Sequence, residues 1–235
     1  MLSRPQNCSE SARSVQERIA WAAREAHRSV DSITLLAVSK GQSAAAIEAA
    51  ARAGIEHFGE NFLQESLPKI AALAGRELTW HFIGRLQANK TRAVAENFAW
   101  VHAVDRLKIA ERLSAQRPHH AAPLNVCLQL HQGGEVSKGG VDATEMPQLA
   151  RAVAALPNLR LRGLMCMPPA EDAPEQQRRW FHEARQVFDY LNEHGLRLDT
   201  LSMGTSADFE AAIAEGANIV RVGTAIFGPR PANNE

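Results

Sequence analysis

The hydrophobic positions of this chain fall into short apolar runs that alternate with longer amphipathic segments. Short apolar runs bounded by polar residues are typical of buried strands, whereas apolar residues spaced three and four positions apart predict helices. The predicted strands are 34–40, 56–60, 78–84, 99–105, 124–130, 159–167, 198–204 and 218–224. The predicted helices between them are 44–53, 62–73, 89–97, 106–116, 143–156, 174–194 and 207–215.

A further helix is predicted ahead of the first strand. Between Ser9 and Arg28, Val15 and Ile19 recur at helical spacing together with Ala22 or Ala23. Trp21 lies nearby, and we expect it to anchor this leading helix against the rest of the protein.

Eight strands that alternate with helices predict an α/β fold, a single (β/α)8 TIM barrel with an extra N-terminal helix. A doubly wound open sheet is the alternative, but the loop that follows the first strand, Ser39-Lys40-Gly41-Gln42-Ser43, lacks the Gly-x-Gly-x-x-Gly fingerprint. The expected organisation is a leading helix at 1–30, a barrel at 31–230 and a disordered tail at 231–235.

The formal net charge is zero, and the acidic and basic residues are interspersed. No whole-chain field therefore attracts the protein to nucleic acid or to an anionic membrane. Cys8, Cys127 and Cys166 are widely spaced, which predicts reduced thiols in the cytoplasm and no metal site. The N-terminus lacks the apolar core of a signal peptide, and no apolar stretch approaches the ~20 residues that span a bilayer.

Lys40 ends the first predicted strand, and barrels of this type carry their functional side chains at the carboxyl ends of the strands. An amine at the mouth of an apolar site loses charge stabilisation, which favours the neutral form that can condense with an aldehyde. The alternative is a lysine that only keeps a strand end soluble. Lys40 is the leading candidate for covalent chemistry.

Loops rich in small residues follow the last two predicted strands. The first contains Gly204 and Ser206, and the second contains Gly223 and Thr224. Phosphate sites in these barrels are often built from these two loops and a helix N-terminus. Ser206 is also expected to cap the helix that follows it. An ordinary pair of turns is the simpler interpretation, and the residues alone leave both open.

Arg221 lies inside the last predicted strand, on the same face as Ile219 and Gly223, because side chains alternate along a strand. A structural ion pair would explain a lone strand arginine. Beside an amine and a phosphate cup, however, its guanidinium could donate to a ring nitrogen or hold an anion. Together these groups describe a receptor for pyridoxal 5′-phosphate, an aldehyde with a phosphate and a heteroaromatic ring.

Motifs along the chain extend this picture. They are Ala37-Val38-Ser39-Lys40, Phe58-Gly59-Glu60-Asn61, Trp80-His81-Phe82-Ile83-Gly84-Arg85-Leu86-Gln87, Arg162-Gly163-Leu164-Met165, Leu201-Ser202-Met203-Gly204 and the run from Val220 to Gly228. In this order they resemble the pyridoxal phosphate homeostasis proteins of the YggS/PROSC type. The resemblance covers nearly the whole chain after the leading helix.

The resemblance implies a barrel similar to the N-terminal domain of bacterial alanine racemase, with pyridoxal 5′-phosphate held as an internal aldimine. The cofactor-binding residues that it implies are Lys40, as the Schiff base, and Asn61, Ser206, Arg221, Gly223 and Thr224. Ser206, Gly223 and Thr224 match phosphate-binding positions, and Arg221 matches the arginine at the pyridine nitrogen. The chain departs from the family at Gly41, at Thr205 and in the segment 135–140 after the fifth predicted strand, none of which is an anchoring position.

Two other residues compete for a role. Lys138, in the glycine-containing loop from His131 to Gly140, is the rival amine, and we expect a surface or gating role for it. His81 is interpreted as a satisfied core histidine in preference to a site residue.

The resemblance favours a protein that binds pyridoxal 5′-phosphate reversibly, buffers it and delivers it to apoenzymes, without strong catalysis. The alternative is a racemase or an aldolase. A racemase of this fold takes a second base from a tyrosine of a second domain, whereas this chain ends after the eighth predicted strand and its single tyrosine, Tyr190, falls in a predicted outer helix. A monomer is favoured over a dimer, and a scaffold without chemistry is the third reading.

Overall fold

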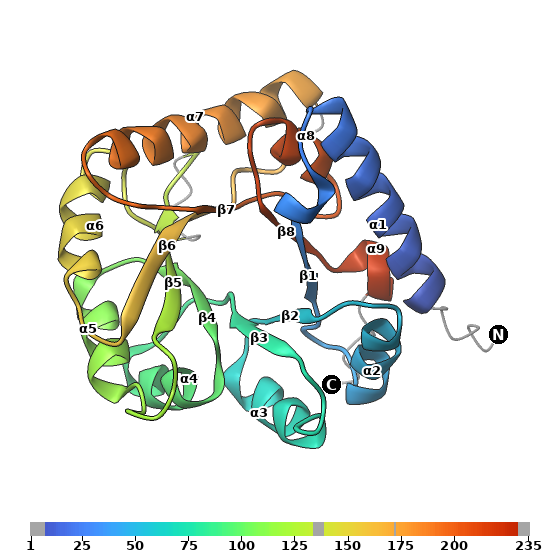
Figure 1. The fold of residues 1–235 in the computed structure, drawn as a ribbon, viewed down its shortest axis with the longest axis horizontal. Coiled ribbons are helices and arrows are strands. Elements are labelled where there is room, and N and C mark those ends of the chain that lie inside the picture. The colour runs from blue at the N-terminus through green and yellow to red at the C-terminus, as the bar shows by residue number, and fades with distance from the viewer. Residues whose placement is uncertain (1–7, 134–138, 172, 230–235) are drawn as a thin grey trace.

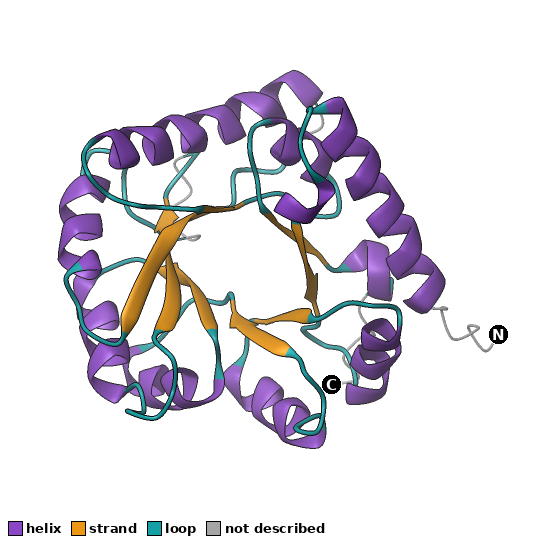
Figure 2. Ribbon diagram, viewed as in Figure 1, coloured by secondary structure: helices purple, strands orange, loops and turns teal. Residues whose placement is uncertain are grey.

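The chain folds into a closed barrel of parallel strands that is surrounded by helices (Figures 1 and 2). The computed structural model describes residues 8–133, 139–171 and 173–229. Strands β1 to β8 follow one another around the barrel in chain order, and β1 also pairs with β8, which closes the ring. The predicted (β/α)8 architecture is confirmed. Lys138 and the tail at 231–235 lie outside the described residues.

The strands begin and end close to the predicted positions. They are β1 (Thr34–Val38), β2 (His57–Glu60), β3 (Thr79–Phe82), β4 (Trp100–Val104), β5 (Leu124–Leu130), β6 (Leu159–Cys166), β7 (Thr200–Ser202) and β8 (Ile219–Val222). The helices are α1 (Cys8–Glu25), α2 (Ala44–Arg52), α3 (Leu63–Ala72), α4 (Thr91–Asn97), α5 (Leu107–Gln116), α6 (Met146–Ala154), α7 (Pro174–Glu193), α8 (Phe209–Ala214) and α9 (Thr224–Phe227). Two short 3-10 turns, η1 (Val30–Ser32) and η2 (Ala88–Lys90), complete the described elements.

Helix α1 lies on the outside of the barrel beside α2, α8 and α9 (Figure 1). Its buried face includes Val15, Ile19, Ala22 and Ala23, as the helical spacing predicts. The expected anchoring role of Trp21 is wrong, because this side chain is 54% exposed. Trp21 follows Ile19 by two residues, and two steps of about 100° carry it to the opposite side of the helix.

Alternation along each strand sends successive side chains to opposite sides of the barrel wall. In β8, Val220 and Val222 are fully buried beneath the helices, whereas Arg221 is directed inward. The loop after β1 follows the same rule, because Ser39 hydrogen bonds with the outer layer and Lys40 lines the cavity inside the barrel mouth. Neighbouring residues thus serve two different layers.

The helices of the described ranges are all too short or too polar to cross a membrane. Cys8, Cys127 and Cys166 are free thiols, and burial raises the pKa of both Cys127 and Cys166 to about 12. These two thiols therefore stay protonated near neutral pH.

Candidate functional site

A cavity of about 580 Å³ opens at the carboxyl ends of the strands. Its lining includes all of the residues that the sequence singles out for a cofactor: Lys40, Asn61, Ser206, Arg221, Gly223 and Thr224. They come from the ends of β1, β2, β7 and β8 or from the loops that follow them. These residues are far apart in the chain, but closure of the barrel brings them together because β1 and β8 pair directly.

The turn that carries Lys40 continues the β1 ladder for one residue beyond the strand. The main-chain N–H of Ser39 donates to the carbonyl of Gly59 at 2.9 Å, and the N–H of Gln42 donates back to the Ser39 carbonyl at 3.0 Å. Gly41 has φ of 73°, a left-handed conformation that a glycine adopts without strain. The turn therefore fixes the backbone on both sides of Lys40.

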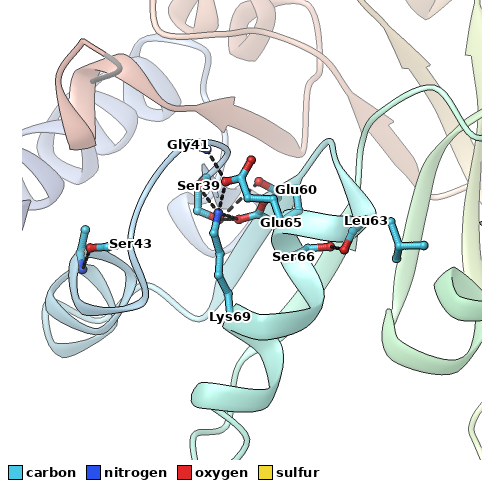
Figure 3. Close-up of polar contacts among 10 residues, drawn as sticks. Ser39, Gly41, Ser43, Glu60, Leu63, Glu65, Ser66 and Lys69 are labelled. Carbon is cyan, nitrogen blue, oxygen red and sulfur yellow. Dashed lines mark hydrogen bonds and ion pairs between the residues drawn. The ribbon is translucent and has the colours of Figure 1, made fainter. Parts of the chain in front are cut away.

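A buried ionic cluster behind the barrel wall holds this turn in place (Figure 3). Nζ of Lys69 donates to the Ser39 carbonyl and to Oε1 of Glu60, both at 2.9 Å, and it also contacts Glu65. Oε1 of Glu65 accepts the main-chain N–H of Gly41 at 2.5 Å. Helix α3, which carries Lys69 and Glu65, is thus joined to the residues that flank Lys40.

Glu60 is fully buried and faces α3, away from the cavity. Burial raises the pKa of its carboxyl, while hydrogen bonds from Ser39 and Lys69 oppose that rise. Its Oε1 accepts the Ser39 hydroxyl at 2.6 Å, whereas Oε2 has no hydrogen-bond partner among the described residues. The sequence offers Glu60 as a strand-end residue, but alternation places it in the supporting layer.

The loops after β7 and β8 meet through Ser206. Its hydroxyl accepts the main-chain N–H groups of Gly223 and Ala225, each at 3.3 Å. The expectation that Ser206 caps the next helix is wrong, because α8 begins later, at Phe209, with Asp208 in the capping position. Asp208 Oδ1 instead accepts the N–H and the hydroxyl of Thr205. Ser206 consequently ties two loops together beside the cavity.

Two close approaches of the backbone around the cavity depend on glycine, one between Gly204 and helix α8 and one between Gly84 and the loop after β2. Gly204 has φ of +91°, and a Cβ placed there would lie 2.7 Å from Cβ of Ala212. At Gly84 an added Cβ would lie 2.2 Å from the carbonyl oxygen of Asn61. Glycine at these two positions lets the mouth of the barrel contract around the cavity.

Arg221 lies on the cavity wall and is only 5% exposed. Nη1 donates to the carbonyl and to the hydroxyl of Ser202, and Nη2 donates to the carbonyl of Cys166 at 2.8 Å. Burial lowers the pKa of this guanidinium, and the nearby Asp208 works against that effect. A structural ion pair is not what holds Arg221, because no carboxylate is among its hydrogen-bond acceptors in the described ranges.

Asn61, which follows β2, supplies an acceptor on the cavity wall. Its Oδ1 is buried and has no hydrogen-bond partner within the described residues. An unpaired buried oxygen costs about 1–3 kcal/mol unless a donor reaches it. A ligand that carries a donor group would remove that penalty, so this side of the cavity fits a ligand with a hydrogen-bond donor.

His81 is buried inside the barrel, and both of its ring nitrogens are hydrogen-bonded to other histidines. It does not line the cavity, which agrees with the interpretation as a core histidine. Sequence reasoning missed Lys69, Glu65 and Ser202, which hold the candidate residues without lining the cavity. A lysine four residues after a glutamate in an amphipathic helix is the only signal that pointed to Lys69.

Comparisons with known proteins agree along the whole barrel. The family model for the alanine racemase N-terminal domain matches residues 13–231. A relative from Pseudomonas aeruginosa, called pyridoxal phosphate homeostasis protein, is 54% identical over 221 residues, which cover 94% of this chain and 95% of that protein. A protein of the same name from Escherichia coli K12 is 51% identical over 223 residues, covering 92% of this chain and 94% of that one.

A solved structure extends the likeness to three dimensions. PipY of Synechococcus elongatus PCC7942, with PLP bound, has a TM-score of 0.78 at 38% identity. The alignment covers 89% of this chain and 100% of that chain.

Proposed function

Since the chain belongs to the alanine racemase N-terminal domain family, and within it to the pyridoxal phosphate homeostasis proteins, we propose that it binds and buffers pyridoxal 5′-phosphate. The observation that carries the proposal is the single cavity on which the amine, the two hydroxyl-bearing loops and the arginine converge. When bound, this cofactor supplies an aldehyde that condenses with a primary amine, a phosphate dianion and a ring nitrogen.

Each group has a matching residue on the cavity wall. Lys40 presents its amine from a turn that Lys69 and Glu65 hold from behind. Ser206 and Thr224 offer hydroxyl groups, and Gly223 brings the backbone close, for the phosphate. Arg221 has an Nε–H and one Nη2–H without a protein acceptor among the described residues, and we assign one of these donors to the ring nitrogen.

A permanently charged guanidinium at the ring nitrogen disfavours protonation of that nitrogen, because a second positive charge there is repelled. A neutral pyridine ring withdraws electrons less strongly than a protonated one. The bound ring would therefore be a weaker electron sink than one whose nitrogen pairs with a carboxylate.

The decisive measurement is the visible absorption spectrum of the purified protein after incubation with pyridoxal 5′-phosphate. We expect a visible absorption band that the protein without cofactor lacks. After reduction with borohydride, mass spectrometry should find the cofactor attached to Lys40. Lys40→Ala should lose both signals, whereas Lys108→Ala, at an exposed lysine of α5, should keep them. A band that survives in Lys40→Ala would refute the assignment of the anchor.

The position of the single tyrosine does not favour a racemase. Tyr190, the single tyrosine, is 45% exposed and lies on the outer helix α7. Exchange of the α-hydrogen of an amino acid in deuterated water measures the alternative. We expect no exchange above the rate with free cofactor. Steady enzymatic turnover would show that the function is catalysis and would refute buffering.

We further propose that the loaded protein resides in the cytoplasm and transfers its cofactor to apoenzymes. The half-exposed thiol of Cys8 and the buried thiols of Cys127 and Cys166 are consistent with a reducing compartment. Reconstitution of an apoenzyme with loaded protein should run at least as fast as with an equal amount of free cofactor. If the apoenzyme is reconstituted no faster than the cofactor dissociates spontaneously from the loaded protein, the function is restricted to buffering.

A further inference from the structure

Three histidine rings form a hydrogen-bonded column through the inside of the barrel. Nδ1 of His57 lies 2.9 Å from Nε2 of His81, and Nδ1 of His81 lies 2.9 Å from Nε2 of His102. Nδ1 of His102 lies 2.8 Å from the hydroxyl of Ser202, to which Nη1 of Arg221 donates at 2.9 Å. The column of His57, His81 and His102 thus joins the first residue of β2 to the arginine on the cavity wall.

The arginine fixes the direction of every hydrogen bond in the column. A guanidinium has donors and no acceptor, so the Ser202 oxygen accepts from Arg221. The hydroxyl proton of Ser202 then points to Nδ1 of His102, which is its remaining side-chain partner among the described residues. His102 consequently carries its proton on Nε2 and donates to His81, which donates in the same way to His57. Each ring turns its lone pair toward the arginine.

Burial keeps the two inner rings neutral, as this arrangement requires. His81 and His102 are fully buried. Burial, with a smaller contribution from the charge of Arg221, lowers the pKa of His102 to about 3. Burial and the neighbouring rings lower the pKa of His81 well below its usual value. A neutral ring can accept from Ser202, whereas a protonated ring could only donate.

We propose that His102 is a positioning residue for Arg221, because it orients the Ser202 hydroxyl and thereby fixes the guanidinium whose free donors face the cavity. His102 and Ser202 do not line the cavity, so they act through Arg221 and without touching a ligand. The inference rests on the proposed function, since the acceptor for Arg221 is the ring nitrogen of the cofactor. His81 and His57 support His102 from behind by accepting and passing on its hydrogen bond.

The direction of the column is tested without any cofactor. Long-range ¹⁵N–¹H NMR of the apoprotein, labelled at histidine nitrogen, reports which ring nitrogen carries the proton. We expect the Nε2–H tautomer for both His81 and His102 near neutral pH. An Nδ1–H tautomer for His102 would overturn the proposal, because the ring would then donate to Ser202 and could not orient its hydroxyl toward itself.

The effect on the site is tested with two variants of one residue. His102→Leu removes the acceptor, whereas His102→Asn places an amide oxygen near the position of Nδ1. We expect release of pyridoxal 5′-phosphate to be about three- to tenfold faster in His102→Leu, and to return toward the wild-type rate in His102→Asn, since a hydrogen bond that orients a charged group has an effect of this order. The wavelength of the visible band should shift in the leucine variant only.

A matched control separates positioning from loss of packing. Cys127→Ala also truncates a fully buried side chain inside the barrel, but Cys127 has no place in the column or in the cavity lining. We expect this variant to lower the melting temperature while it leaves the release rate and the band unchanged. Equal release from His102→Leu and Cys127→Ala would overturn the positioning role. Absence of a band from the wild-type protein would instead refute the proposed function itself.

Discussion

Replacement of Lys69 by methionine tests the support of the Lys40 turn most directly. The Lys69 side chain is 9% exposed and that of Glu60 is fully buried, with 2.9 Å between Nζ and Oε1. Methionine keeps the length of the side chain but removes the charge and three donors. Glu60 would then be left as a buried carboxylate without its cation.

The magnitude follows from the burial of the pair. Removal of one partner from a buried ion pair costs about 3–5 kcal/mol, and we expect Lys69→Met to fall near the lower value because the Ser39 hydroxyl still donates to Glu60. Glu65 is 32% exposed, so its share of the cluster is screened by water. Glu65→Gln should therefore cost only about 1 kcal/mol or less.

The loss should depend on pH in a defined direction. Burial already raises the pKa of Glu60, and loss of Lys69 raises it further. A carboxyl with a raised folded-state pKa stabilises the fold below its unfolded pKa, and this contribution is lost as the pH rises through the folded value. The deficit of Lys69→Met should therefore be smaller at about pH 5 than at about pH 8.

Urea unfolding of the apoprotein at both pH values measures these differences. The matched control is the double variant Lys69→Met with Glu60→Gln, which removes the orphan charge and should recover most of the lost stability. In the cofactor-loaded protein, Lys69→Met should also release pyridoxal 5′-phosphate faster, because the turn around Lys40 loses its tie to α3. A pH-independent deficit, or a double variant no more stable than Lys69→Met, would refute the electrostatic account of the cluster.

Other variants probe the two loops and the arginine. Ser206→Ala removes the acceptor that joins Gly223 and Ala225, and we expect cofactor affinity to fall about tenfold in a fluorescence titration; unchanged affinity would remove Ser206 from the phosphate cup. Gly204→Ala, at φ of +91°, should cost about 1–3 kcal/mol in urea unfolding, and a stability equal to wild type would contradict the strained geometry. Arg221→Glu should weaken cofactor retention on a desalting column more than Lys138→Ala does, and equal retention would mean that the pocket is wrongly assigned.

Much of the fold could be predicted because the spacing of hydrophobic residues is a local signal for each helix and strand, and because eight alternating units generally close into a barrel. Each predicted strand range contains the observed strand, as 78–84 contains Thr79–Phe82. Six of the eight predicted ranges are too long at the mouth of the barrel, where the chain leaves the ladder to form loops, whereas those of β2 and β5 end at the observed residue. Alternation grouped Arg221 with Ile219 and Gly223 but left its direction open, and the structure turns it to the cavity. Lys40 was placed at the mouth by its position at the end of a strand.

The supporting residues could not be predicted in the same way. The contact between Lys69 and the Ser39 carbonyl depends on how α3 packs behind β1 and β2, which no periodicity specifies. The link from His102 to Ser202 spans the barrel interior and depends on the register of distant strands. The capping role expected for Ser206 failed because α8 begins at Phe209, and helix starts depend on tertiary contacts as well as on capping residues.

The two faces of the barrel wall separate the residues that would contact the ligand from those that hold the Lys40 turn. The residues that would touch the ligand face inward, while the side chains that grip the Lys40 turn belong to the helical layer. Substitutions in α3 could then lengthen or shorten the dwell time of the ligand while its chemical surroundings stay the same. Natural variation in the outer layer would then set how fast homologous proteins release the same ligand.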